Sequence, residues 1–325
     1  MGEFEKETLR DKYDEARQKE LKELLDPETG ELSLKFSQYV NCPICGKEES
    51  ETLFKKNGFT FVRCNDCDHV YSNPQVNEEL VLQSYGEAES NDIWIDVLLT
   101  EAQRKEHDRK YNHMLPIIER FCPLKGRMLE LGCSLGFFLQ KAKASGWDCI
   151  GLELNDRAIK YAREEFGLDV RKQILEETDF EDAYFDAVAM LGVLEHLGRP
   201  FETLQEVHKA LRNGGILALE VNNVYSLAAR IMHEKTFTFD GRNHLQYFCI
   251  KSLTKLLEQS GFQVAHYYTD IPSLPPILSY LSYNDPYFSE RPDHFNLSPR
   301  EIKVIGDIIC RLDLGYRIFM FAQKM

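Results

Sequence analysis

The sequence predicts an α/β protein with a parallel sheet covered by helices on both faces, and a small metal-binding module ahead of it. Two observations lead to this prediction. From residue 127 onward, short apolar strands alternate with amphipathic helices, an order typical of parallel sheets. Closer to the N-terminus, two Cys-x-x-Cys pairs lie between residues 42 and 67. A chain of 325 residues is also longer than one average domain needs.

The composition is that of a folded, acidic protein. Hydrophobic residues make up 43% of the chain and charged residues 28%, which excludes an intrinsically disordered chain. Asp and Glu number 53 against 39 Lys and Arg, a formal charge of −14. Such a chain repels phosphate backbones unless its basic residues gather on one face, so nucleic acid is an unexpected partner. Without a membrane-length apolar run or a signal-peptide core, the protein is expected to be soluble and cytoplasmic.

Four of the nine cysteines form the pairs Cys42-Pro-Ile-Cys45 and Cys64-Asn-Asp-Cys67. Each Cys-x-x-Cys turn aims two thiolates at one point, and two such turns supply the four sulfur ligands of a tetrahedral zinc site. Two disulfides are the alternative, but a cytosolic compartment disfavours them. A redox motif would need only one pair. Because sulfur would fill all four positions, the predicted zinc is structural.

Three segments are expected ahead of the sheet. Residues 1–38 hold an amphipathic helix, which could pack on the body of the chain or form a homodimer; the sequence does not choose. Residues 39–75 form the zinc-binding module, and residues 76–125 form a helical linker or lid.

Residues 126–325 are expected to form the sheet domain, with a proline- and tyrosine-rich insertion at 270–316. A capping box from Ser298 to Glu301 begins a helix after the prolines. The last strand, 317–322, is expected to join the sheet as an antiparallel edge strand. The other strands are expected at 127–131, 148–153, near 170, 185–191, 216–221 and 262–268, and the helices at 135–145, from 156, at 200–212 and at 252–260.

The first strand of this series ends in the glycine turn Glu130-Leu-Gly-Cys-Ser-Leu-Gly136. The spacing of a dinucleotide fold, G-x-G-x-x-G, is absent. The G-x-S-x-G of a hydrolase elbow is present, but no acid and histidine in suitable order accompany Ser134 as a nucleophile. Glu130 instead stands where a carboxylate could organise an ammonium group. Glu153 ends the next strand, where a carboxylate can accept both ribose hydroxyls of a nucleoside.

With these motifs, residues 127–264 resemble the class I S-adenosylmethionine-dependent methyltransferases. The resemblance implies a seven-stranded Rossmann-like fold with an antiparallel last strand, and S-adenosylmethionine as the methyl donor. Ser134 departs from the family, where many members have a glycine. The segments that carry the resemblance are 129–136, 151–153, 185–188, 194–197, 211–216, 243–248 and 261–262.

The resemblance also implies which residues contact the cofactor. The glycine turn would lie under the methionine portion, Glu153 would bind the ribose, and apolar side chains would enclose the adenine. Tyr85 and Trp94 are expected in a lid that excludes water. The expected cofactor residues are Glu130, Gly132, Ser134, Gly136, Glu153, Leu154, Ile174, Leu175, Leu191 and Tyr85.

The cysteine module joined to such a domain is similar to a subgroup of bacterial sugar, surface-polysaccharide and natural-product methyltransferases. Some of these are sugar C-methyltransferases with Tyr-His-Glu-His before an aromatic pair. Here the stretch reads Gly241-Arg-Asn-His244, which makes O-methylation the expected reaction. The expected acceptor is a small molecule or a saccharide.

Methyl transfer to a hydroxyl needs alignment of acceptor, methyl and sulfur, and a base. His244 follows the fifth strand and His196 follows the fourth, so both are expected at the ligand-binding edge of the sheet. His244 is the expected base and His196 the alternative; either could instead be a packed core histidine. Two rival functions remain: a zinc-bearing RNA methyltransferase, although the zinc segment is not basic, and a non-catalytic scaffold.

Overall fold

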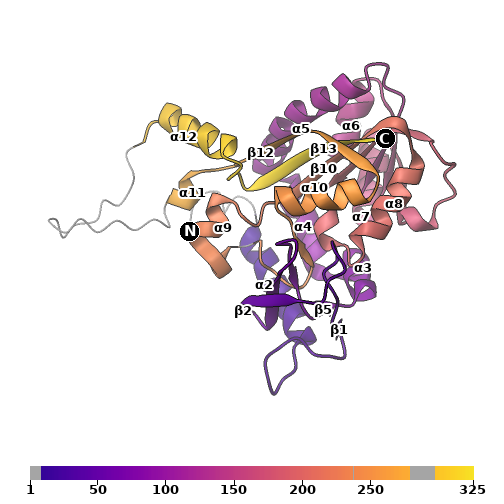
Figure 1. Cartoon of the computed structure of the whole chain (residues 1–325). Coiled ribbons are helices and arrows are strands. Elements are labelled where there is room, and N and C mark those ends of the chain that lie inside the picture. Colours follow the sequence, from indigo (N-terminus) through magenta and orange to yellow (C-terminus); the bar gives the residue numbers. More distant parts are fainter. Residues whose placement is uncertain (1–8, 237, 279–296) are drawn as a thin grey trace.

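A computed structural model describes residues 9–236, 238–278 and 297–325 of the chain (Figure 1). A mixed seven-stranded sheet forms the centre, in the order β12-β13-β10-β9-β6-β7-β8. The neighbouring pairs from β10 to β8 are all parallel. The strands are β6 (Arg127–Leu131), β7 (Asp148–Leu152), β8 (Asp169–Arg171), β9 (Phe185–Leu191), β10 (Leu211–Asn222), β12 (Phe262–Asp270) and β13 (Arg317–Lys324).

The last strand is antiparallel, as predicted, but the expectation of an edge strand is wrong. β13 lies between β10 and β12 and pairs antiparallel with both. Five successive residues, Ile318 to Ala322, are buried. An unbroken apolar run suits a strand that has neighbours on both sides and helices on both faces, whereas an edge strand would alternate or carry charge.

Two helical layers cover the sheet (Figure 1), because successive residues of each strand point to opposite faces. Leu129 of β6 faces the core beneath α8 (Pro200–Ala210) and α10 (Ile250–Gln259). Met128 faces the opposite core. The helices of that second layer are α5 (Glu101–Phe121), α6 (Phe137–Ala144) and α7 (Asp156–Phe166).

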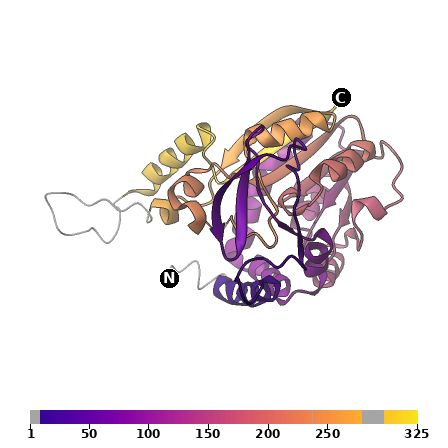
Figure 2. The same ribbon diagram turned by 60° about the horizontal axis from the view of Figure 1, so that its bottom comes forward.

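The N-terminal helix α2 (Arg10–Leu24) docks on the same chain, against α4 (Glu89–Leu99) (Figure 2). Its apolar face is buried at Ala16 and Leu21. Arg17 forms a buried ion pair with Asp240, with 3.2 Å between Nη1 and Oδ2. The segment expected to be helical at 76–125 consists of α3 (Glu78–Glu87), α4 and α5.

The cysteine segment forms a four-stranded antiparallel sheet in the order β11-β4-β3-β2. Its edge strand β11 comes from a distant part of the chain and begins two residues after His244. Val62 and Tyr71 of the cysteine segment also share a hydrophobic core with α8 and α10. The small strands are β1 (Ser37–Gln38), β2 (Ser50–Lys56), β3 (Phe59–Cys64), β4 (Val70–Ser72), β5 (Gln75–Val76) and β11 (Gln246–Tyr247), where β1 pairs with β5.

The remaining elements are short or peripheral. The helix α12 (Pro299–Arg311) begins at the predicted Ser298 capping box. Residues 279–296 of the predicted proline- and tyrosine-rich insertion at 270–316 lie outside the described residues. Within the part of the chain that the structure describes, no helix has the length and apolar character to cross a membrane. The other elements are η1 (Leu175–Glu177), η2 (Leu194–His196), α9 (Leu227–Met232), η3 (His233–Lys235) and α11 (Pro275–Leu278).

The interior position of β13 predicts a large loss of stability on truncation. Phe321→Ala should lower the free energy of unfolding by about 3–5 kcal/mol, because the cavity left between two helical layers cannot close. Val304→Ala, at a position of α12 that is 50% exposed, is the control and should cost less than about 1 kcal/mol. Urea unfolding measures both. A loss for Phe321→Ala as small as the control would contradict the interior placement.

Candidate active site

A cavity of about 1490 Å³ lies at the carboxyl ends of the parallel strands. The ends of β6, β7, β9 and β10 form one wall, and α3, α4 and α5 form the other. Ligands bind at this edge in open α/β sheets. The volume is above the usual range for one drug-sized ligand, roughly 300–1,000 Å³, so the cavity has room for a nucleoside and a second molecule.

The glycine turn after β6 forms the floor of the cavity at Gly132 and Ser134. Gly132 has φ +64°, and a Cβ there would lie 2.6 Å from Cγ2 of Val193, so the turn needs glycine. Ser134 also adopts a left-handed conformation, with φ +48°, which serine accepts at some cost. Gly136 begins α6 and is close to Leu168, but it is absent from the cavity wall. A Cβ at Gly136 would lie 2.6 Å from Cδ1 of Leu168, so close packing requires glycine here, and its contact with the cofactor stays a prediction.

Glu153, at the end of β7, is held by three backbone amides. Its carboxylate accepts hydrogen bonds from the N–H groups of Ser134 and Leu154, both at 2.7 Å, and of Asn155 at 2.9 Å. An ionised carboxylate has about four acceptor sites. The three amides therefore orient the group and leave about one acceptor site, on Oε2, for a ribose hydroxyl.

Glu130 is buried in the cavity wall, 3% exposed. Its Oε2 has no hydrogen-bond partner among the described residues. Burial raises the pKa of this carboxyl well above its ordinary value, and the charge of Lys110 opposes the rise. A buried acceptor without a donor is costly, so this atom is suited to a cationic donor such as an ammonium group.

The expected apolar contacts also line the cavity: Leu154, Ile174, Leu175 and Leu191. Tyr85 and Trp94, from α3 and α4, face them. The ring of Tyr85 lies edge-on to His196, with centroids 5.5 Å apart. The segment predicted to be a lid therefore covers the cavity beside the histidines.

His196 and His244 lie together in the same cavity, with ring centroids 4.7 Å apart. Nδ1 of His196 donates to the carbonyl oxygen of Asn243, and Nδ1 of His244 to that of Thr238, both at 3.0 Å. These bonds fix the rings and leave Nε2 of His244 for another partner. Burial, together with the neighbouring His244, lowers the pKa of His196 to about 3. His196 is therefore a weak base and stays neutral near pH 7.

Two buried acids beside the histidines were not among the predicted site residues. Burial raises the pKa of Glu195 to about 7, although His244 opposes the rise. Asp240 accepts hydrogen bonds from the backbone N–H groups of Asn243 and His244. Burial acts to raise the pKa of Asp240, but His244 and Arg17 hold it below its ordinary value. The only sequence signal for Glu195 is its position next to His196.

The ligand atoms of Glu195, His196 and His244 all lie within 4.8 Å of one another. Such a set can share one proton, or hold a divalent transition-metal ion through two imidazoles and one carboxylate. In either case, the shared proton or the metal ion would lie beside the two imidazole rings.

A charged cluster that contains Lys110, Glu220 and Arg317 also lines the cavity. None of the three was among the predicted site residues. Lys110 and Glu220 form a buried ion pair, with 2.6 Å between Nζ and Oε2. Nη1 of Arg317 lies 3.4 Å from Oε1 of Glu220, and its Nη2 lies 2.5 Å from Oδ2 of Asp270. An acid at the end of the apolar strand β10 was the available signal, because a buried carboxylate needs a cationic partner.

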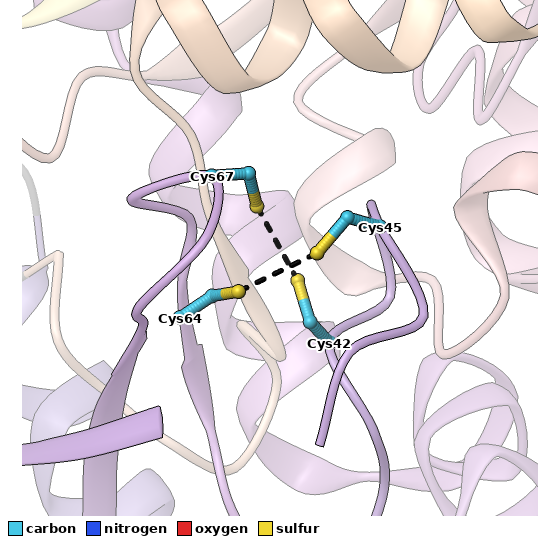
Figure 3. A group of neighbouring side chains, drawn as sticks. All are labelled: Cys42, Cys45, Cys64 and Cys67. Atoms are coloured by element: carbon cyan, nitrogen blue, oxygen red, sulfur yellow. Dashed lines mark hydrogen bonds between the residues drawn. The ribbon is translucent and has the colours of Figure 1, made fainter. Parts of the chain in front are cut away.

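The four predicted zinc ligands converge on one point (Figure 3). Sγ of Cys42 lies 3.5 Å from that of Cys67, and Sγ of Cys45 lies 3.4 Å from that of Cys64. These separations are too long for disulfides, and all four cysteines are free. Tetrahedral zinc sets sulfur–sulfur distances of about 3.8 Å. The hydrogen bond between Cys42 and Cys67 lowers the pKa of the Cys67 thiol and raises that of Cys42. The residues fit a structural zinc ion.

Comparison with curated proteins finds several partial relatives. YqeM of Bacillus subtilis, named as a candidate methyltransferase, is 27% identical over 39% of this chain and 54% of YqeM. A tRNA U34 carboxymethyltransferase of Pseudoalteromonas translucida is 33% identical over 35% of this chain and 36% of its own. A ubiquinone biosynthesis O-methyltransferase of Roseobacter denitrificans is 33% identical over 29% of this chain and 40% of its own length. The chain spans about half the length of these relatives, or less.

Among solved structures, the magnesium protoporphyrin IX methyltransferase ChlM of Synechocystis PCC 6803, which contains bound S-adenosylhomocysteine, has the same fold. Its TM-score is 0.53 at 13% identity, over 77% of this chain and 100% of that chain. The family of methyltransferase domains matches residues 101–267, slightly more than half of the sequence. The chain therefore belongs to the methyltransferase-domain family, with the fold of the S-adenosylmethionine-dependent methyltransferases.

Proposed function

We propose that the protein transfers a methyl group from S-adenosylmethionine to a hydroxyl of a small-molecule or saccharide acceptor, such as a nucleotide sugar, a polysaccharide unit or a natural product. One observation carries the proposal: a single cavity joins the glycine turn and Glu153 to the pair His196 and His244. Nucleoside-binding and proton-accepting groups thus lie within reach of one bound pair of molecules.

In this proposal, different parts of the cavity wall bind different parts of the cofactor. Gly132 and Ser134 lie under the methionine portion, Glu130 accepts the ammonium group, and Glu153 accepts a ribose hydroxyl. The adenine lies among apolar side chains. The cofactor supplies an electrophilic methyl on a sulfonium sulfur. The apolar contacts are Leu154, Ile174, Leu175 and Leu191, with Tyr85 in the lid.

His244 is the proposed base, and His196 its neighbour in the catalytic pair. With Nδ1 donating to a backbone carbonyl, the lone pair of His244 is on Nε2, where it can accept a hydroxyl proton. His196, whose pKa is lowered to about 3, stays neutral and is suited to orienting the acceptor. Lid closure by the helices at 76–125 would exclude water from the reacting atoms.

The charges around the cavity favour a small acceptor over a nucleic acid. Acids such as Glu106, Glu195 and Glu220 line it beside the cofactor carboxylates, and the formal charge of the chain is −14. The similarity to an O-methyltransferase of ubiquinone biosynthesis supports small-molecule chemistry. The similarity to a tRNA-modifying enzyme keeps an RNA acceptor as the second candidate. A non-catalytic scaffold would not need the intact cavity.

Two further parts of the proposal concern assembly and location. Cys42, Cys45, Cys64 and Cys67 would hold a structural zinc ion, which takes no part in the transfer. Thiolate ligands need a reducing compartment, which supports a cytoplasmic enzyme. A homodimer through α2 would use the exposed face of that helix, since Ala16 and Leu21 are buried within the chain.

Removal of the ribose-binding carboxylate should weaken cofactor binding. Glu153→Ala should cost about 1–3 kcal/mol in the affinity for S-adenosylhomocysteine, the scale of lost charge-assisted hydrogen bonds. Glu153→Gln, which keeps the shape that supports the turn, should cost less. Glu164→Ala on the exposed face of α7 is the control. Isothermal titration calorimetry measures all three, and tight binding of NAD with none of S-adenosylhomocysteine would overturn the assignment.

Removal of the base should lower turnover and leave cofactor binding intact. His244→Ala should reduce kcat by about 10²–10⁴-fold, the contribution of general base catalysis, while the affinity for S-adenosylhomocysteine stays nearly constant. His196→Ala should cost less, and the exposed His113→Ala nothing. Full turnover by the His244→Ala variant would refute the assignment of His244 as the general base. Loss of wild-type activity on removal of a metal ion, with the cysteine-bound zinc retained, would instead make Glu195, His196 and His244 metal ligands.

The acceptor class should appear in the salt dependence. Labelled S-adenosylmethionine offered with a panel of nucleotide sugars, saccharides and phenols should give a product by mass spectrometry. The rate should change little between about 50 and 200 mM salt, since few counterions are released. With tRNA fragments as the comparison substrate, a steep fall of affinity with salt and a labelled RNA product would favour the second candidate.

A further inference from the structure

We propose that the cysteine module positions the catalytic histidines, through the pairing of β4 with β11 and through the side chain of Gln246. This inference rests on the proposed roles of His196 and His244. It assigns Gln246 as a positioning residue, and it makes the ordering of the active site depend on the metal-binding knuckle formed by residues 64–69.

The backbone supplies the first link. β4 and β11 pair antiparallel, with Gln246 opposite Tyr71 and Tyr247 opposite Val70. At Leu245, which directly follows His244, the carbonyl oxygen accepts a hydrogen bond from the N–H of Ser72 at 3.1 Å. The N–H of Leu245 donates to the carbonyl oxygen of Glu195 at 2.8 Å. Leu245 is thus held between the cysteine module and the turn that carries His196.

The side chain of Gln246 supplies the second link. It is 1% exposed, and both ends of its amide are used. Oε1 lies 3.0 Å from Nε2 of His69, and Nε2 donates to the carbonyl oxygen of Leu197 at 3.0 Å. The amide therefore joins the module to the residue after His196. A carboxylate cannot replace it, because an ionised carboxylate would face a carbonyl oxygen with no proton to donate.

The knuckle supplies the third link. His69 follows Cys67 by two residues, and its carbonyl oxygen accepts from the N–H of Cys64 at 2.9 Å. An ion pair also joins the knuckle to α10, because Nζ of Lys251 lies 2.5 Å from Oδ2 of Asp68. A continuous path of hydrogen bonds thus runs from the cysteine ligands to both histidine segments. Closing the four sulfurs around a metal would fix the start of that path.

A module that only added stability would not need this path. Its apolar residues already share a core with α8 and α10, and that packing alone would stabilise the fold. The two accounts differ in what a small, buried change at Gln246 does. Loss of stability alone would leave the turnover of the folded enzyme unchanged, whereas loss of positioning lowers kcat in protein that is folded, metal-loaded and able to bind cofactor.

The first experiment changes only the amide, in the full chain purified with its zinc. For Gln246→Glu we expect unchanged zinc content, affinity for S-adenosylhomocysteine within about twofold, and kcat lower by about 10²-fold, the scale of a 1 Å misplacement of reacting groups. Amide hydrogen exchange at 243–248 and 195–197 should accelerate, while exchange at 132–136 stays constant. Gln263→Leu, an exposed glutamine of β12, is the matched control and should change none of these.

The second experiment removes the metal. Chelation of the wild type, or Cys45→Ser, should accelerate exchange in the same two segments, and zinc added back to the chelated protein should restore protection. Native protection at 243–248 after chelation, or an unchanged kcat for folded Gln246→Glu, would overturn the inference. If Cys45→Ser does not fold, the Gln246 variant decides. If no acceptor is ever methylated, the proposed function fails, and the exchange measurements still test the coupling.

Discussion

The common direction of β6, β7, β9 and β10 is the constraint on which the rest of the molecule depends. Parallel strands end at the same edge, so residues up to 90 positions apart in the sequence, from Glu130 to Glu220, meet there. The burial of both faces fixes this direction, because apolar strands between two helical layers tolerate neither a change of register nor an exposed face.

Much of the sheet could be predicted because each strand and helix carries local signals. The boundaries of β6 and β9 agree with the expected ranges 127–131 and 185–191, since glycine turns and charged residues flank these apolar runs. The capping box at Ser298 is also as predicted, because capping depends on residues three positions apart. The convergence of four sulfurs follows from spacing in the same way.

What could not be predicted depends on contacts between distant segments. The place of β13 between β10 and β12 is set by which strands remain available once the sheet has formed, and its own residues indicate only that it is buried. The docking of α2 on α4 and the cluster around Lys110 and Glu220 are also long-range. A charged residue in a sequence does not indicate which distant residue is its ion-pair partner. Gln246 carries no signal at all, because its role exists only where β4 lies beside β11.

The shared strand β11 also changes how the protein can be divided. A boundary at residues 75 and 76 separates two regions of different sequence character, but β4 on one side of it is the pairing partner of β11 on the other. A shortened chain that starts at residue 76 would leave β11 with an open edge and would expose the part of the core now covered by Val62 and Tyr71. The cysteine module is therefore not an interchangeable attachment. Any division of the chain that keeps β11 paired must therefore keep β4 together with the segment that carries His244.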